Sequence, residues 1–194
     1  MAITIERTGR GGLHRYDQVP IHFEVRTELA VEVVDGGLGG LRLVEQPVDL
    51  PYVKDYDRME GPPSTWTAQY DMRGWGIFLA LDEGRPVGGA MVATDAHLMP
   101  LAHFQRDDLA VLWDLRVHPD RRRQRIGSRL LHAAGRWARG RGYRTLAIET
   151  QNVNVPACRF YASQGCDLVV IHRSGYARVP EVAHEVMLVW YLAL

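Results

Sequence analysis

The chain has 194 residues, of which 46% are hydrophobic, so its length and composition fit one domain with a sizeable core. Its 23 basic and 23 acidic residues balance, which argues against nucleic acid or an anionic membrane surface as a partner. No segment has the pattern of a signal peptide or the ~18 apolar residues of a membrane span, and we therefore expect a cytoplasmic protein. Cys158 and Cys166 are too few for a disulfide scaffold and lack metal-ligand spacing, so we expect two buried thiols and no metal site.

The N-terminal part predicts a hairpin followed by short helices. Apolar and polar residues alternate over residues 22–46 on both sides of Asp35-Gly36-Gly37, which predicts a β-hairpin with a glycine-rich turn. Residues 51–59 and 63–72 have helical patterns, and the second helix is expected to open at Pro-Ser-Thr.

A second hairpin is predicted over residues 75–81 and 86–94, joined by a tight turn. A polar loop follows at residues 95–108. Its His97 and His103 are interpreted as ordinary exposed loop residues, with contact to the acceptor substrate as the alternative.

The C-terminal half alternates strands with helices. A strand over 109–117 precedes a helix over 123–140, in which Ile126, Leu130, Ala134, Trp137 and Ala138 form one apolar stripe. An Asn154 cap predicts the start of the next helix. Further elements are expected at 144–150 (strand), 154–164 (helix), and 167–172 and 183–192 (strands). This order implies an α/β sheet of mixed direction with a parallel central pair.

The junction between the strand at 109–117 and the following helix is basic. Four of the five residues from Arg121 to Arg125 are Arg. Backbone N–H groups at a helix N-terminus lack intrahelical partners and carry the positive end of the dipole, so such a junction favours a phosphate or pyrophosphate group. Guanidinium groups add charge-assisted bonds to the same anion. The alternative interpretation is a solvated helix start.

Two motifs carry a family resemblance. R-R-Q-R-I-G at Arg122 to Gly127 resembles the R/Q-x-x-G-x-G/A acetyl-CoA pyrophosphate motif of the GNAT superfamily of N-acetyltransferases, with Arg125 at the first glycine position. From Ile148, I-E-T-Q-N-V-N-V-P-A-C-R-F-Y-A-S-Q-G-C resembles the family's strand followed by N-x-x-A-x-x-F-Y-x-x-x-G-F, with Cys166 in place of the usual Phe. This second motif and the V-W-Y-L segment near the C-terminus are most similar to those of streptothricin acetyltransferases.

The resemblance implies a single N-acetyltransferase domain over residues 1–194. Its fold class would be α/β, with a GNAT-like mixed, largely antiparallel sheet and a central parallel strand pair flanked by helices. Residues 1–74 would form a variable part with the hairpin and acceptor-side helices. Residues 75–194 would form the acetyl-CoA-binding core.

The implied cofactor is acetyl-CoA. We expect the backbone of the strand to pair with the pantetheine arm as an added strand, and the following turn to hold the pyrophosphate. The expected cofactor-binding residues are Leu115, Arg116, Val117, Arg122, Arg123, Gln124, Arg125, Ile126, Gly127, Ser128, Asn154, Ala157 and Tyr161.

Three residues are candidates for the chemistry. The phenol of Tyr161, with a usual pKa of about 10 against about 8.5 for a thiol, can protonate a departing thiolate, the role that this Tyr often has in the family. The alternative is a core aromatic. Glu149 is a candidate general base, or a group that only holds the ammonium or caps an amide. Asp114 is the rival base or amine binder, on a strand that in this family often contains a bulge.

The leading hypothesis is acetyl transfer to a primary amine of a small molecule, such as a streptothricin-like antibiotic, by direct attack in a ternary complex. Such a cationic acceptor would favour an acidic cleft, for which Asp55, Asp57, Glu60 and Asp71 are available. We interpret Trp66, Tyr70, Trp75 and Trp113 as core or cleft wall.

Other interpretations stay open. The spacing of Glu149, Asn154 and Tyr161 resembles ribosomal-protein N-terminal acetyltransferases, so a peptide or protein amine is an alternative acceptor. Arg125 in place of glycine would also suit a catalytically weak acyl-CoA sensor. A homodimer paired through the terminal strand around Trp190 and Tyr191 is a further alternative.

Overall fold

The computed structural model describes residues 3–94 and 106–194, and divides them into two compact units. The first unit contains residues 3–23, 55–94, 106–147 and 193–194, and the second contains 24–54 and 148–192. His97 and His103 lie outside the described residues.

The first unit has a sheet in the order β1-β4-β5-β6, in which neighbouring strands are antiparallel. The predicted hairpin is confirmed as β4 and β5, and the strand predicted over 109–117 is β6 without a shift. β1 was not predicted, because five residues with weak alternation give no clear strand pattern. The strands are β1 (Thr4–Thr8), β4 (Gly76–Asp82), β5 (Arg85–Ala93) and β6 (Leu109–Val117).

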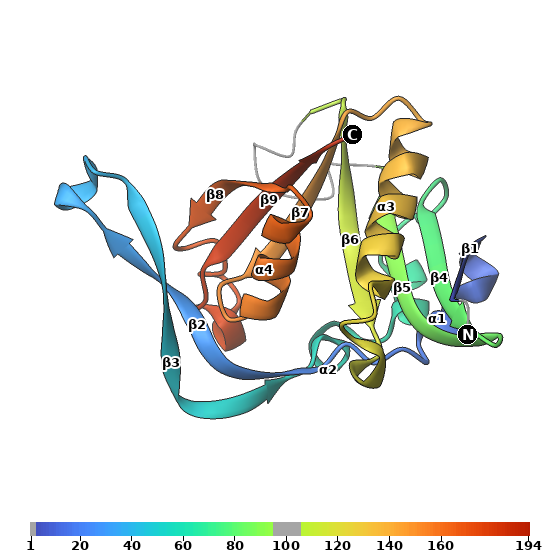
Figure 1. The fold of residues 1–194 in the computed structure, drawn as a ribbon, viewed down its shortest axis with the longest axis horizontal. Helices are drawn as coiled ribbons and strands as arrows, with labels where there is room; N and C mark the ends of the chain where they lie inside the picture. Colours follow the sequence, from blue (N-terminus) through green and yellow to red (C-terminus); the bar gives the residue numbers. More distant parts are fainter. Residues whose placement is uncertain (1–2, 95–105) are drawn as a thin grey trace. The chain divides into compact units, whose positions relative to one another are not determined.

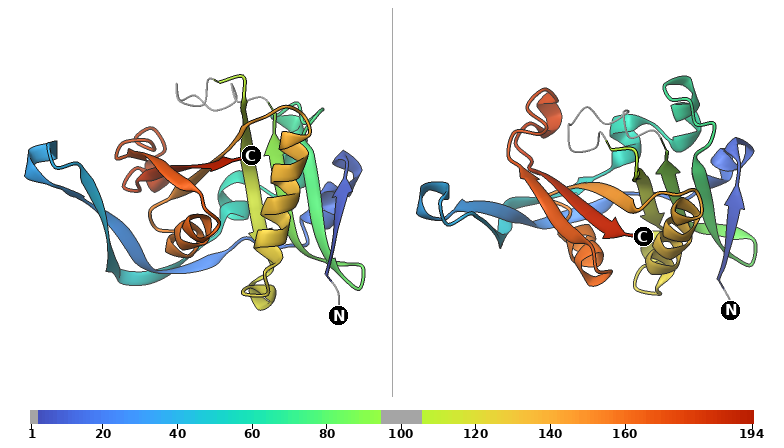
Figure 2. Two further views of the ribbon diagram at one scale, coloured as in Figure 1. Left: turned by 45° about the horizontal axis from the view of Figure 1, so that its top comes forward. Right: turned by 90° about the horizontal axis from the view of Figure 1, so that it is seen from above.

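Helix α3 (Ile126–Arg139) covers one face of β4, β5 and β6 (Figures 1 and 2). The predicted apolar stripe is confirmed at Ile126, Leu130, Ala134 and Ala138, which are all buried, whereas Trp137 is partly exposed. A Cβ atom at Gly88 would approach the Ile126 and Leu130 side chains to 3.0 Å, so this glycine permits the close approach of helix and sheet. After α3 the chain enters β7 (Thr145–Gln151), which follows β6 in the sheet order.

The remaining helices of the first unit are short. α1 (Leu13–Tyr16) was not predicted, and α2 (Tyr56–Glu60) begins later than the helix predicted over 51–59. Residues 51–54 instead continue a strand, and α2 begins where the Asp55 side chain accepts a hydrogen bond from the Asp57 amide at 3.1 Å. The helix predicted over 63–72 is a shorter 3-10 helix, Pro63–Ala68, which opens at the predicted proline. Three-residue 3-10 turns elsewhere in the described chain occupy Arg10–Gly12, Asp35–Gly37, Pro119–Arg121 and Pro180–Val182.

The second unit begins with a long hairpin of β2 (Phe23–Val33) and β3 (Leu41–Lys54). The hairpin predicted over 22–46 is thus confirmed and extends further. Its turn contains Gly36, Gly37 and Gly40, all with positive φ, a conformation that glycine adopts without a steric cost.

The second unit also contains the strand order β7-β9-β8, with α4 (Val155–Ser163) between β7 and β8 in sequence. β8 (Asp167–His172) has the predicted bounds, whereas β9 (Met187–Ala193) begins later than predicted because a 3-10 turn precedes it. β9 lies between β7 and β8. The alternative in which the strand around Trp190 and Tyr191 pairs with a second copy of the chain is therefore wrong, because both edges of β9 are already paired within the chain.

The directions of neighbouring strands agree with the expected mixed α/β sheet. β6 and β7 are parallel strands joined through α3, whereas β1 and β4, β4 and β5, β5 and β6, and β8 and β9 pair antiparallel. None of the helices in the described part of the chain has the length and hydrophobicity needed to cross a bilayer.

Candidate functional site

The predicted site residues fall into two groups, one in each unit. Asp114, Leu115–Val117 and Arg122–Ser128 belong to the first unit, on β6 and on the turn before α3. Glu149, Asn154, Ala157 and Tyr161 belong to the second, on β7 and at the start of α4.

The turn before α3 has an unusual backbone. Arg123 and Arg125 both have a φ of 61°, in the left-handed region that favours glycine. Because residues in this conformation are not helical, α3 begins at Ile126, three residues after the predicted start. Arg125 occupies the first glycine position of the motif, and its φ gives the physical reason for a glycine there.

The N-terminus of α3 is open to an anion. No side chain caps it. The Arg129 amide donates to the Arg125 carbonyl oxygen at 3.1 Å, which is the first i to i−4 hydrogen bond at this end of the helix. The amides of Ile126, Gly127 and Ser128 are therefore among those that a helix leaves without an intrahelical acceptor. They point out at the positive end of the helix dipole.

The four arginines of the turn have different partners. Arg121 forms an ion pair with Asp82, and Arg122 donates to the carbonyl oxygen of His22 at 2.8 Å. Arg123 and Arg125 are exposed and form no ion pair with any residue that the structure describes. Two guanidinium groups thus remain for an anion beside the free amides.

β6 carries the predicted bulge. Its pairing with β5 shifts register where Met91 is opposite Asp114 and Val92 is opposite Leu112, so Trp113 is the extra residue. Trp113, Leu115 and Val117 are partly exposed on one face of the strand, whereas Asp114 and Arg116 are buried.

Asp114 and Arg116 form a buried ion pair. Nε of Arg116 donates to Oδ1 of Asp114 at 3.0 Å, and Nη2 donates to Oδ2 at 2.8 Å. The Tyr16 hydroxyl also donates to Oδ1. Both oxygens of the Asp114 carboxylate therefore have donors from this chain.

The pair extends to α2. Nη1 of Arg116 donates to both carboxylate oxygens of Asp57 at 3.0 Å and to the Val19 carbonyl at 3.1 Å. Burial disfavours the charge on Arg116, but the neighbouring Asp114 and Asp57 carboxylates raise its pKa above the usual value. Burial, and then Asp114, raises the pKa of Tyr16. The network fixes the bulged strand to α1 and α2.

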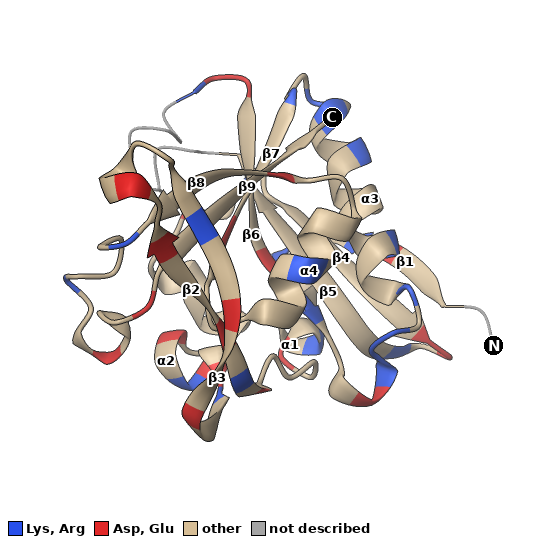
Figure 3. Ribbon diagram, turned by 60° about the vertical axis from the view of Figure 1, so that its left-hand side comes forward, with Lys and Arg blue, Asp and Glu red and all other residues tan. Residues whose placement is uncertain are grey.

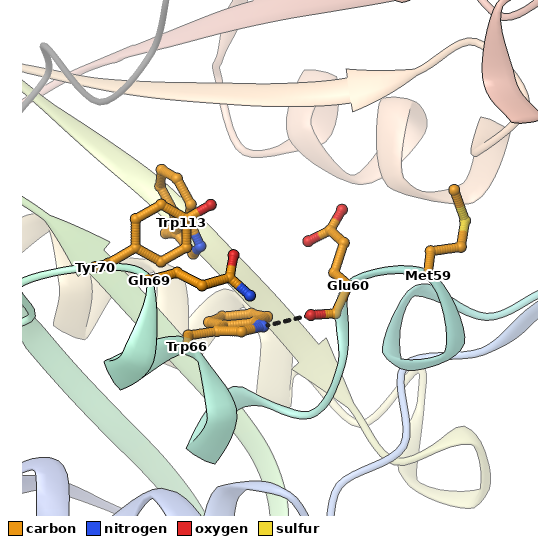
Figure 4. A pocket seen from close by; sticks show the side chains of 6 residues that line it. All are labelled: Met59, Glu60, Trp66, Gln69, Tyr70 and Trp113. Carbon is orange, nitrogen blue, oxygen red and sulfur yellow. Dashed lines mark hydrogen bonds between the residues drawn. The ribbon is translucent and has the colours of Figure 1, made fainter. Parts of the chain in front are cut away.

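A pocket of about 270 Å³ lies beside the bulge (Figure 4). Tyr70 contacts Trp113 edge-on, with a centroid distance of 4.9 Å, and Trp113 lies 5.2 Å from Trp75. Nε1 of Trp66 donates to the Gly61 carbonyl at 3.1 Å and so fixes the indole. The expected cleft-wall interpretation agrees with the lining of the pocket by Met59, Glu60, Trp66, Gln69, Tyr70 and Trp113.

In the second unit, Glu149 lies on β7 and accepts a hydrogen bond from the Tyr176 hydroxyl at 2.7 Å. Burial raises the pKa of Glu149, although the bond from Tyr176 opposes this shift. The loop residue Tyr176 is itself buried. Glu149 is therefore a carboxylate with a fixed orientation and a raised pKa.

Tyr161 lies on α4 and is 7% exposed. Its ring packs edge-on against Phe160 at 5.4 Å and lies 6.4 Å from Trp190. Asn154 caps the same helix, since its Oδ1 accepts a hydrogen bond from the Ala157 amide at 3.2 Å. The predicted Asn cap is confirmed.

Both cysteines are free and buried, as expected. Burial raises the pKa of the Cys158 thiol to about 12 and that of the Cys166 thiol to about 11. Such thiols are not ionised near neutral pH, and a thiolate is the nucleophilic form of cysteine.

Sequence reasoning missed several residues that organise the site. Tyr16 and Tyr176 orient Asp114 and Glu149 from distant positions, so no local pattern reveals them. Asn152 is buried, and its side chain donates to the Leu29 carbonyl at 3.2 Å and accepts from the Val186 amide at 2.8 Å. Two asparagines in Q-N-V-N offered a signal, but only Asn154 was recognised.

Basic and acidic residues are interspersed along the hairpin β2–β3 and around α2 (Figure 3). Within the described part of the chain, no three His, Cys, Asp or Glu side chains are grouped as a metal site would require.

Comparison with known proteins places these features in a family. The family model described as "Acetyltransferase (GNAT) family" matches residues 49–166. A region of 82 residues is 34% identical to streptothricin acetyltransferase A of Bacillus subtilis and covers 42% of this chain and 47% of that protein. A region of 85 residues is 34% identical to streptothricin acetyltransferase of Escherichia coli and covers 44% of this chain and 49% of that protein. The chain thus matches about half the length of these curated relatives.

Solved structures share the fold over the whole chain. A Bacillus anthracis protein assigned as a streptothricin acetyltransferase, solved in complex with acetyl coenzyme A, has a TM-score of 0.77 at 21% identity and covers 100% of this chain and 98% of that one. A nourseothricin acetyltransferase has a TM-score of 0.75 at 23% identity, with 100% and 99% covered. A ribosomal-protein alanine N-acetyltransferase of Escherichia coli has a TM-score of 0.60 at 19% identity, with 99% and 94% covered. Because the family model matches more than half of the sequence, the chain belongs to the acetyltransferase (GNAT) family.

Proposed function

We propose that this chain is an acetyl-CoA-dependent N-acetyltransferase that acts on a primary amine of a small molecule of the streptothricin type. The observation that carries the proposal is the uncapped N-terminus of α3, preceded by the bulged strand β6 and by two exposed arginines without ion pairs among the described residues. Family membership and the names of the curated relatives support the same activity and acceptor class.

The residues present fit the expected cofactor. The amides of Ile126, Gly127 and Ser128, with the guanidinium groups of Arg123 and Arg125, suit a pyrophosphate because they supply N–H donors and positive charge together. The partly exposed stretch from Leu115 to Val117 suits the pantetheine arm as an added strand. Acetyl-CoA supplies the activated acetyl group as a thioester.

Direct attack by the amine fits this chain better than an acyl-cysteine route. Cys158 and Cys166 are buried, and their raised pKa values keep them as thiols. For the proton that a departing thiolate needs, we propose the hydroxyl of Tyr161.

We propose Glu149 as the general base, either directly or through a water. A raised pKa brings a carboxylate closer to the pH at which it can accept a proton from an ammonium group. The carboxylate of Asp114 already accepts bonds from Arg116 and Tyr16 on both oxygens. We therefore assign Asp114 to positioning the bulge of β6 rather than to proton transfer.

The test is release of free thiol from acetyl-CoA with a panel of amines: streptothricin, polyamines, aminoglycosides and short peptides. We expect turnover with a small-molecule amine, and a 10²- to 10⁴-fold loss of kcat in Tyr161→Phe, roughly the contribution of a general acid. The KM for acetyl-CoA should change little, because the ring that packs on Phe160 remains.

Other outcomes would replace the proposal. Turnover confined to peptides would identify an N-terminal acetyltransferase, consistent with the fold shared with the ribosomal-protein enzyme. Binding of acetyl-CoA without any turnover would identify an acyl-CoA sensor, for which Arg125 at the glycine position is the relevant observation.

A further inference from the structure

Helix α2 supplies one wall of the aromatic pocket but buries none of its own side chains. Met59 and Glu60 lie on this helix, and Figure 4 shows them on the side of the pocket opposite Trp113. None of the five residues of α2 is buried, whereas the neighbouring 3-10 helix, which lines the same pocket, buries two of its side chains. Helical stability in proteins comes mainly from the packing of an apolar face. The position of α2 therefore depends on a few individual contacts.

These contacts attach α2 at both ends. At its C-terminal end, the Glu60 carbonyl oxygen accepts a hydrogen bond from Nε1 of Trp66 at 3.3 Å. In its first turn, both carboxylate oxygens of Asp57 accept hydrogen bonds from Nη1 of Arg116 at 3.0 Å. The contact of Asp57 joins α2 to β6, the strand that we expect to bind the pantetheine arm.

The guanidinium of Arg116 does not need Asp57 for charge balance. Asp114 already supplies one carboxylate, which accepts hydrogen bonds from Nε and Nη2 of Arg116. The third nitrogen, Nη1, also donates to the Val19 carbonyl. Without Asp57 the buried guanidinium would keep a matching negative charge and a hydrogen bond at each nitrogen, so the large penalty of an unpaired buried charge would not arise.

Folding stability does not explain the charge of Asp57 either. Burial raises the pKa of Asp57 above its usual value, although Arg116 opposes this shift. The stability that such a carboxyl group contributes is present at low pH and is lost as pH rises through the raised pKa. Near neutral pH the ionised group therefore costs folding free energy, which points to a role in the position of α2.

We propose that Asp57 is a positioning residue for acetyl transfer, which through Arg116 holds α2, and with it the wall of Met59 and Glu60, against the bulged strand. Asp57 acts through the helix and does not contact the amine, since both of its oxygens are directed to Arg116. A misplacement of about 1 Å in the groups that position a substrate can cost about 10²-fold in rate. The inference rests on the proposed function, because it takes the aromatic pocket to be part of the acceptor site.

The first experiment measures the attachment of α2 without any substrate, by amide hydrogen exchange of the full chain followed by mass spectrometry. In Asp57→Asn the amides of α2 should exchange on the order of tenfold faster, because the ion pair no longer opposes local opening of the first turn. The amides of β6 should keep their rates, since Arg116 retains its bonds to Asp114 and Val19. Urea denaturation near neutral pH should show no loss in the free energy of unfolding.

The second experiment measures steady-state kinetics with the amine that the parent chain acetylates best. Asp57→Asn should raise the KM for this amine on the order of tenfold, with kcat and the KM for acetyl-CoA nearly unchanged. Asp108→Asn is the matched control, because Asp108 also pairs with an arginine, Arg106, but lies before β6 and outside the pocket lining. Both KM values should keep the parent values in this control.

Faster exchange of α2 with an unchanged KM for the amine, or an equal rise of that KM in Asp108→Asn, would overturn the inference. A raised KM without faster exchange would also overturn it, because Asp57 would then contact the amine itself. If the parent chain bound acetyl-CoA but acetylated no amine, the proposed function would be rejected. The exchange rates alone would then decide whether Asp57 holds α2.

Discussion

At the scale of single residues, the two candidate bases differ in what surrounds them. Asp114 is held by a guanidinium and a phenol, and the resulting ion pair is buried. Glu149 has one neutral donor, Tyr176, and its pKa is raised by burial. A neutral donor orients a carboxylate without the strong stabilisation of its charge that a guanidinium gives, so Glu149 keeps the capacity to accept a proton.

Glu149→Gln should abolish the acidic limb of the pH–rate profile and lower kcat/KM by 10²- to 10⁴-fold, roughly the contribution of a general base. Because the folded-state pKa of Glu149 is raised, the stability that it contributes is present at low pH and is lost as pH rises through that pKa. The free energy of unfolding of the parent chain, relative to the variant, should therefore fall as pH rises. Urea unfolding at a series of pH values measures this difference.

Asp114→Asn provides the contrast. It weakens a buried ion pair, so we expect a loss of folding stability, while the pH–rate profile keeps its acidic limb. If the limb disappeared in Asp114→Asn and remained in Glu149→Gln, the roles of these two carboxylates would be reversed.

At the scale of elements, the turn before α3, which we propose as the pyrophosphate site, has a strained backbone. A left-handed conformation costs a non-glycine residue about 1–2 kcal/mol, and both Arg123 and Arg125 adopt it. The folded chain is therefore strained at this turn. The same backbone conformation leaves the first amides of α3 without a side-chain cap. Local strain of this kind is common where a backbone must present its N–H groups to a ligand.

Arg125→Gly should raise the free energy of unfolding by up to about 1 kcal/mol, the relief of strain less the conformational entropy of glycine. It should bind acetyl-CoA at least as tightly as the parent chain, because glycine permits a closer approach of the pyrophosphate. Chemical denaturation and calorimetry measure the two quantities.

Arg123→Gly is its control, since Arg123 has the same φ but does not occupy a motif glycine position. We expect a similar gain in stability and weaker binding of acetyl-CoA, because a guanidinium is lost without closer approach. Equal weakening in both variants would show that charge alone sets affinity at this turn.

Asn152 and Asn154 connect different elements, so their substitution by Ala should reduce stability by different amounts. Asn152→Ala should cost about 1–3 kcal/mol, because it removes the hydrogen bonds that the buried Asn152 side chain makes to the part-buried Leu29 carbonyl and Val186 amide. Asn154→Ala should cost about 1 kcal/mol, the usual value of a helix cap. Thermal unfolding of the two variants measures the difference, and equal costs would contradict the role of Asn152 in joining β2 to the segment before β9.

At the scale of the whole molecule, the candidate groups are divided between the two units. The first unit carries the proposed pyrophosphate turn and the aromatic pocket, and the second carries Glu149 and Tyr161. Each group is held by contacts inside its own unit. In the second unit these include a buried ion pair between Lys54 and Glu185, which ties the end of β3 to the segment before β9.

Acetyl-CoA at a hundredfold excess over its Kd should stabilise the folded chain by about 2.7 kcal/mol, which corresponds to a rise in Tm of roughly 5–11 °C for a chain of this size. Adenosine, which lacks the pyrophosphate, should produce no comparable rise. A scan with both compounds measures the shift. An equal response to the two would contradict pyrophosphate binding at the start of α3.

The sequence by itself determined the features that depend on neighbours a few residues apart. Periodicity located β6 and β8 and the buried stripe of α3, and a single side chain identified the Asn154 cap. The tertiary structure decided which charges are paired. Tyr16 reaches Asp114 across 98 positions of sequence, and the loop residue Tyr176 reaches Glu149 across 27. It also decided the left-handed turn at Arg123 and Arg125 and the interior place of β9. Alternation and capping are local properties of the chain, whereas burial, pairing and pKa depend on what packing brings together from distant segments.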